Sequence, residues 1–108
     1  MNVTVSSVTM QKEILKRHLG GELFEEITLD DSAFTDGVCK AGNPIAKDGK
    51  VDNATAPVGI LLNDVYKTNP NGTIVKAFAC VNEANANANA GITIAEAVKT
   101  ALTLIVFE

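Results

Sequence analysis

The distribution of apolar residues along the chain predicts a small β-rich domain. Beyond position 35, short apolar runs alternate with turn-forming residues. The dipeptides Asp36-Gly37, Asp48-Gly49 and Asn71-Gly72 are those preferred where a hairpin needs positive backbone dihedrals. They separate apolar runs at 38–41, 44–46, 58–62, 73–81 and 102–107. In the run 73–81 both faces are apolar except at Lys76, which indicates a strand near the middle of a curled sheet.

The N-terminal part has a different pattern. Val3, Val5 and Val8 lie among Ser and Thr and form a short β-prone arm. The segment Met10–Leu19 is predicted to be an amphipathic helix, with Thr9 as its N-cap and two glycines at its end. Such a short helix is marginal in water, so it needs a surface to pack against.

Two elements are expected near the C-terminus. The alternating tract Ala84–Ala90 has side chains too small to build a core, which favours an exposed loop. Thr93 and Glu96 fit a capping box that opens a short helix through Leu102. The apolar stretch Leu104–Phe107 then closes the chain as a buried, paired strand.

Together these elements predict a mainly β fold with two short helices, of the α+β class. The length of 108 residues fits one folded domain. We divide it into residues 1–35, the N-terminal arm with its short amphipathic helix, and residues 36–108, a compact β-rich domain.

Composition and charge exclude several classes of partner. Aromatic residues make up 5% of the chain and Trp is absent, so the core must consist of Val, Ile, Leu and Ala. The net charge is -4 and the chain has no basic run, which disfavours nucleic acid and anionic membranes. No stretch of about 18 apolar residues and no secretory start are found, so we expect a product of the cytoplasm.

Candidate catalytic groups are few. His18 is the only histidine, and it lies in a basic stretch typical of a solvated surface. Cys39 and Cys80 are far apart and are expected to be buried, reduced thiols. The acidic residues Asp30, Asp31 and Asp36 do not match a calcium-binding loop. We therefore expect no enzyme, no cofactor and no metal, and a protein that acts by binding.

A family resemblance makes this expectation more specific. The order of Lys40-Ala41-Gly42-Asn43-Pro44-Ile45, Gly49, Pro57-Val58-Gly59-Ile60-Leu61-Leu62 and Val65 resembles the head decoration proteins of tailed bacteriophages, of the lambda-like type. The helix and apolar strand of residues 95–107 fit the end of that family. The resemblance covers roughly residues 36–108, and the Asn-Ala tract departs from it.

The resemblance implies a small β-tulip or β-barrel-like domain. It also implies a homotrimer that binds the major capsid protein on the outside of the expanded head and stabilises the head against internal DNA pressure. The protein would be made in the bacterial cytoplasm and would reside on the exterior of the virion. Neither nucleic acid nor a membrane is an expected partner.

Within this hypothesis the arm is the candidate capsid contact. Its residues are Val3, Val5, Val8 and Met10, because an apolar, β-prone terminus can add a strand to an exposed sheet edge. The arm can also pair within its own domain or stay disordered. Two other classes remain open. One is a tail- or neck-associated structural adaptor, and the other is a small ligand-binding or enzymatic β domain with a site near Cys39.

Overall fold

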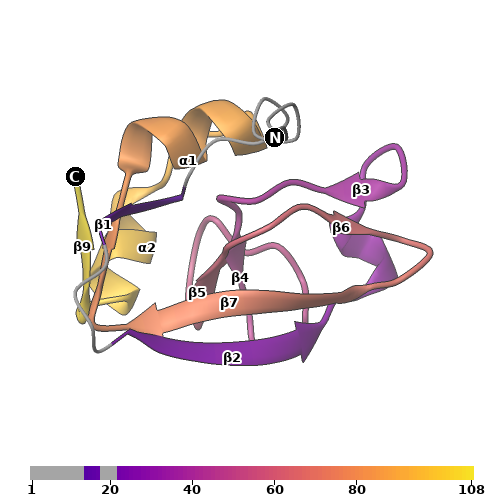
Figure 1. Ribbon diagram of the computed structural model, residues 1–108, viewed down its shortest axis with the longest axis horizontal. Helices are drawn as coiled ribbons and strands as arrows, with labels where there is room; N and C mark the ends of the chain where they lie inside the picture. The colour runs from indigo at the N-terminus through magenta and orange to yellow at the C-terminus, as the bar shows by residue number, and fades with distance from the viewer. Residues whose placement is uncertain (1–13, 18–21) are drawn as a thin grey trace, which may run out of the picture.

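The structure, a computed structural model, describes residues 14–17 and 22–108 and confirms a mainly β fold with two short α-helices (Figure 1). The strands are β1 (Leu15–Arg17), β2 (Leu23–Thr28), β3 (Val38–Cys39), β4 (Pro44–Ile45), β5 (Gly59–Leu61), β6 (Val65–Tyr66), β7 (Asn71–Ala77), β8 (Ala79–Val81) and β9 (Ile105–Phe107). The helices are the 3-10 helix η2 (Asp31–Ala33), α1 (Glu83–Ala90) and α2 (Glu96–Ala101). The described sheets are open, so the expected barrel-like closure is not found.

One continuous segment, residues 71–81, contributes to both of the larger sheets. The four-stranded sheet has the order β2-β7-β5-β4 with antiparallel neighbours, so β7 lies inside it as the sequence predicts. The run is interrupted at Phe78, which has a φ of 59°. Beyond Phe78 the chain continues as β8 in the second sheet, β1-β8-β9, where β9 pairs with β8 in parallel. β3 and β6 form a separate two-stranded ribbon.

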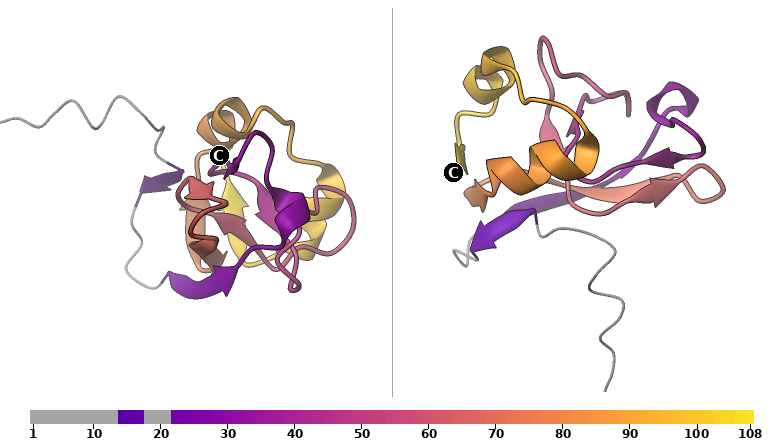
Figure 2. Two further views of the ribbon diagram at one scale, coloured as in Figure 1. Left: turned by 90° about the vertical axis from the view of Figure 1, so that its right-hand side faces the viewer. Right: turned by 90° about the horizontal axis from the view of Figure 1, so that it is seen from above.

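The four-stranded sheet separates two hydrophobic cores. On β7, Val75 packs into the larger core while its neighbour Ile74 packs into the smaller one. The larger core contains Ala86 of α1, Val98 of α2 and residues of the second sheet. The smaller core lies under η2, β3 and β6. Figures 1 and 2 accordingly place α1, α2 and β9 at one end of the molecule and η2, β3 and β6 at the other.

Residues 22–35 belong to the same packed structure as the rest of the described chain. β2 pairs with β7 along its whole length, from Leu23 opposite Ala77 to Thr28 opposite Asn71. Leu29 and Ala33 lie in the smaller core. The four-stranded sheet is therefore complete only with strands from both sides of position 35.

The predicted helix Met10–Leu19 is wrong where the structure describes it. Residues 15–17 form β1, which pairs antiparallel with β8, and residues 10–13, 18 and 19 lie outside the described residues. The C=O of Ile14 accepts a hydrogen bond from the N–H of Asn82, and the Ile14 side chain is buried. In β1 the backbone groups pair with those of β8. A short helix at this position would be marginal in water without a surface to pack against.

The expected exposed loop at Ala84–Ala90 is also wrong, because this tract forms α1. The Asn82 side chain caps the helix by accepting from the N–H of Asn85 at 3.1 Å, and Gly91 ends it in the left-handed conformation. The small side chain of Ala86 is fully buried against the loop that contains Gly42. Small residues thus let the helix backbone approach this loop closely, which a composition-based argument overlooks.

The local turn and cap predictions have mixed outcomes. Asp36-Gly37 is a two-residue hairpin turn with both φ values positive, as predicted. Asn71-Gly72 is not a turn but the start of β7, so the turn predicted there is wrong. The glycine is explained by packing, since a Cβ at Gly72 would lie 2.5 Å from Val65 Cγ2.

At the C-terminus, helix α2 is present, but its N-cap is Ala95 without a side-chain hydrogen bond, so the predicted capping box is wrong. The paired C-terminal strand, β9, is confirmed.

We predict that Gly42→Ala destabilises the protein far more than Gly91→Ala. Both glycines have positive φ, but a Cβ at Gly42 would lie 2.5 Å from the Ala86 carbonyl oxygen, whereas at Gly91 nothing lies within 4 Å. Gly91→Ala should cost about 1–2 kcal/mol from the left-handed backbone alone. Gly42→Ala should cost more than about 3 kcal/mol, because α1 must also shift. Urea unfolding of both variants measures the difference, and equal losses would contradict this packing of α1.

Candidate functional site

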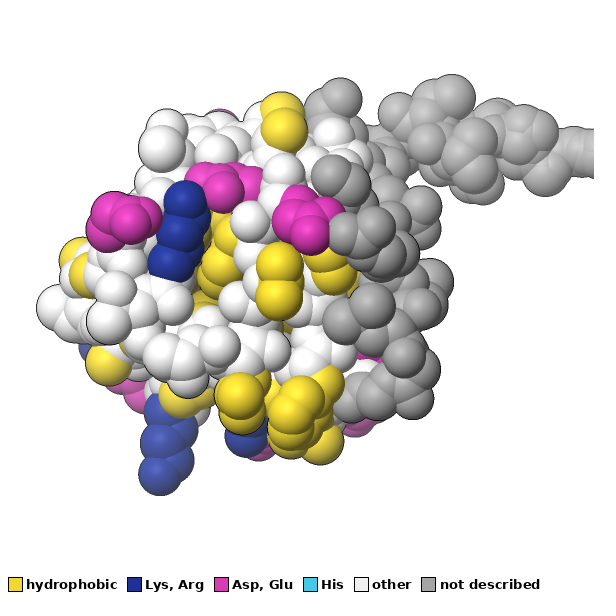
Figure 3. All heavy atoms as spheres, turned by 90° about the vertical axis from the view of Figure 1, so that its left-hand side faces the viewer, with side chains coloured by type: hydrophobic (Ala, Val, Ile, Leu, Met, Phe, Trp, Pro, Cys, Tyr) yellow, Lys and Arg dark blue, Asp and Glu magenta, His cyan; other side chains and the backbone are white. Residues whose placement is uncertain are grey.

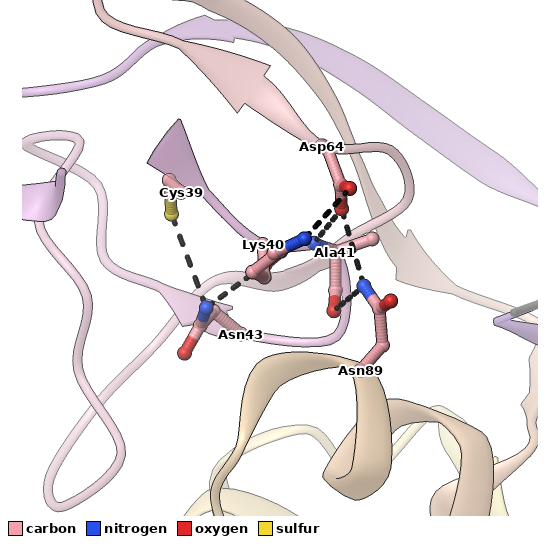
Figure 4. Close-up of polar contacts among 6 residues, drawn as sticks. All are labelled: Cys39, Lys40, Ala41, Asn43, Asp64 and Asn89. Atoms are coloured by element: carbon pink, nitrogen blue, oxygen red, sulfur yellow. Dashed lines mark hydrogen bonds and ion pairs between the residues drawn. The ribbon is translucent and has the colours of Figure 1, made fainter. Parts of the chain in front are cut away.

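A polar cluster at one end of α1 is built around Asp64 (Figure 4). The Asp64 carboxylate accepts hydrogen bonds from the Ala41 N–H at 2.8 Å and from Asn89 Nδ2 at 3.1 Å, and it lies 3.6 Å from Lys40 Nζ. Asn89 Nδ2 also donates to the Ala41 carbonyl oxygen at 2.9 Å. The cluster fixes α1 against the loop between β3 and β4. These contacts are internal to the fold and give the cluster a structural role.

Cys39 lies beside this cluster and is the candidate of the enzymatic alternative. It is buried on β3, with Sγ 4.0 Å from Asn43 Nδ2. Burial, and after it the negative charge of Asp64, raises the pKa of the Cys39 thiol to about 11. The thiol is therefore protonated at neutral pH, and a protonated thiol is a poor nucleophile. The prediction of two buried, reduced thiols is confirmed for Cys39 and Cys80.

The strongest surface feature is a cluster of large apolar side chains at the end of the molecule that carries β9. Its members, which we call the apolar end, are exposed by 46% to 56%: Leu23, Phe24, Phe78, Leu104 and Val106. Figure 3 shows this side of the molecule, where apolar side chains gather near the lower edge. Large apolar side chains exposed near one another are suited to contact with another protein surface.

Backbone pairing brings the members of the apolar end together from three elements. Leu23 at the start of β2 is opposite Ala77, the residue before Phe78. The Phe78 N–H donates to the Leu104 carbonyl oxygen at 2.8 Å. Val106 is opposite Cys80 in the pairing of β9 with β8. The apolar end therefore lies where the two sheets meet, with Phe78 between β7 and β8 and Leu104 just before β9.

Phe78 is an unusual residue for its backbone conformation. A φ of 59° lies in the left-handed region, where Asn, Asp and Gly are favoured and another residue costs about 1–2 kcal/mol. The Phe78 side chain is 54% exposed, so burial within this chain recovers only part of that cost. Residues held in such conformations cluster at functional positions.

The edge of the second sheet lies beside the same residues. In the order β1-β8-β9, β9 is the outer strand among the described residues. An edge strand presents backbone N–H and C=O groups that can pair with a further strand. The apolar end and this edge together form one surface suited to protein contact.

The sequence did not single out this surface, and the predicted contact residues are not part of it. Val3, Val5, Val8 and Met10 lie outside the residues that the structure describes. The available signal was the stretch Leu104–Phe107, which is apolar at every position. In a strand only alternate residues face one side, so such a stretch leaves some apolar side chains outside the core.

Residues 14–17 and 22–108 hold no group of three His, Cys, Asp or Glu side chains that could bind a metal ion. Among the same residues no helix is long and apolar enough to cross a membrane.

Comparisons with known proteins give no relatives. No protein-family model matches the chain, and no curated protein or solved structure matches it either. Function must therefore be argued from the residues and from the geometry of the surface.

We predict that Cys39 resists alkylation in the folded protein. Its raised pKa keeps the thiol protonated, so reaction with iodoacetamide at pH 8 should be much slower in buffer than in urea, and in buffer should still accelerate up to about pH 11. For the same reason the unfolded state loses this proton first, and the contribution of Cys39 to stability is lost as the pH rises from 9.0 to about 11. Mass spectrometry of the Cys39 peptide measures the rate. Rapid labelling of the folded protein at pH 8 would contradict the assignment.

Proposed function

We propose that the protein is a virion structural protein that works by binding, in the manner of phage head decoration proteins. The observation that carries the binding role is the apolar end, with five large hydrophobic side chains about half exposed on a rigid sheet framework. The decoration role itself rests on the resemblance of residues 40–65 and 95–107 to that family. The protonated state of the Cys39 thiol weighs against the enzymatic alternative.

The two binding surfaces have separate tasks in this proposal. The apolar end forms the contact between copies of the chain, which assemble as a homotrimer. Residues Val3, Val5, Val8 and Met10 of each copy contact the major capsid protein. Three arms on one trimer make the second and third contacts intramolecular, so weak single contacts give a tight hold. Binding to the expanded shell alone stabilises that state by mass action.

Self-association is physically reasonable for a chain of this size. A domain of about 100 residues buries only about 60–70% of the surface that its unfolded chain exposes. Covering the apolar end removes further apolar surface from water, at about 25 cal/mol per Å². It also covers the half-exposed ring of Phe78, the residue with the strained backbone.

We predict that the double variant Phe78→Asn with Val106→Thr dissociates the oligomer without unfolding the subunit. Asn is favoured at positive φ and Thr has nearly the shape of Val, so the fold should be retained while the contact becomes polar. The dissociation constant should rise at least about tenfold, equivalent to about 1.4 kcal/mol. Analytical ultracentrifugation measures the mass, and circular dichroism checks the fold.

The matched control for this variant is Tyr66→Ser. Tyr66 is 58% exposed, but it lies on β6 at the opposite end of the molecule, so its loss should not change the mass. A wild-type protein that sediments as a single 11.3 kDa chain at every concentration would overturn the proposed contact between copies.

We predict that a chain lacking residues 1–9 folds and keeps its oligomeric state but no longer co-sediments with expanded, undecorated phage heads. The full-length protein should bind these heads saturably and should not bind unexpanded shells. Retained binding by the shortened chain would contradict the proposal that the arm contacts the capsid protein. Binding of the full-length protein to purified tails, with none to heads, would favour the tail- or neck-adaptor alternative.

A further inference from the structure

A groove lies between the C-terminal end of α1 and the region of η2 and β3, and none of its lining residues belongs to the apolar end. It has a volume of about 450 Å³ and is formed by the segment from η2 to the loop after β3, by Val51, and by the C-terminal end of α1. Its walls include the apolar side chains of Val38, Val51 and Ile92. Asp64, which has a structural role, does not line this groove. The groove is therefore a separate feature of the surface.

Asn43 is the buried polar residue that lines the groove. It is 9% exposed and is the only polar side chain among the buried residues that the structure describes. Its Nδ2 donates to the Lys40 carbonyl oxygen at 2.8 Å and lies 4.0 Å from Cys39 Sγ. Its Oδ1 accepts no hydrogen bond from the described residues, and Figure 4 shows it directed away from Cys39 and Lys40. A buried acceptor without a donor is unfavourable, so this oxygen is suited to a ligand that donates a hydrogen bond.

The electrostatics of the groove favour a positively charged donor. Asp36 is one of its lining residues, and so is Ala90 in the last turn of α1. The last turn of α1 contains no basic residue, so the partial negative charge of the helix C-terminus is not neutralised there. Lys40 also lines the groove, but its Nζ lies 3.6 Å from the Asp64 carboxylate, which offsets its charge. The net charge of -4 acts in the same direction.

We propose that this groove binds a guanidinium group carried on an aliphatic chain, such as the side chain of an arginine. One N–H of the guanidinium donates to Asn43 Oδ1, and its charge faces Asp36 and the end of α1. The aliphatic stem packs against Val51 and Ile92. This site is independent of the apolar end and of the proposed capsid role.

The test is an NMR titration of the full-length protein with two cations and a neutral control. The cations are butylguanidinium and N-acetylarginine amide, and the control is N-acetylcitrulline amide, which has nearly the same shape without the charge. Saturable shifts are expected at the Asn43 side-chain NH₂ and at the Cys39 and Ile92 amides in the millimolar range, with the citrulline compound at least about tenfold weaker. Tighter binding of the arginine amide points to a protein-borne side chain, and equal binding points to a free guanidinium ligand; both support the site.

The matched variants are Asp36→Asn and Asp48→Asn. Asn tolerates the φ of 55° at position 36, so the first variant removes the charge without straining the turn, and the affinity should fall about threefold. Asp48 lies in another turn and does not line the groove, so the second variant should bind as the wild type does. The absence of saturable shifts, an equal response to the citrulline compound, or shifts away from the groove would overturn the proposal.

Discussion

The structure depends on one constraint, the passage of the chain from one sheet into the other between β7 and β8. β7 is buried on both faces, with Ile74 in one core and Val75 in the other, so its position is fixed by packing on two sides. β8 is the central strand of the second sheet. A single residue, Phe78, joins the two strands, and the change of direction requires a positive φ. Both cores, and the placement of α1 directly after β8, follow from this connection.

The same connection explains why the surface contains an apolar end. The turn at Phe78 presents its side chain outward, beside the first residues of β2 and next to β9, which the Phe78 N–H holds through the Leu104 carbonyl oxygen. A glycine or asparagine would adopt this turn with less strain. The presence of a phenylalanine there, half exposed, means that the monomer is not at its stability optimum at this position. The contact proposed between copies of the chain would account for that feature, and it would link a strained backbone to the binding role.

Much of the fold could be predicted from the sequence, because the apolar runs and the Asp-Gly turns are local signals. The failures have physical reasons. The segment Met10–Leu19 has a helical pattern of apolar positions, but residues 15–17 pair with β8, a long-range interaction that no local pattern contains. The helix α1 depends on the close approach of Ala86 to Gly42, 44 positions earlier. The apolar end could not be predicted either, since an all-apolar stretch such as Leu104–Phe107 does not reveal which of its side chains face solvent.

The central claim is that another copy of the chain covers the apolar end. Hydrogen exchange measured over a range of protein concentrations tests it most directly, because exchange reports the protection of individual amides. The account predicts that protection at Phe78 and along β9 rises with concentration, while the turn between Tyr66 and Asn69 at the opposite end exchanges at a constant rate. Equal exchange at Phe78 and β9 at all concentrations, in a protein that remains folded, would contradict it.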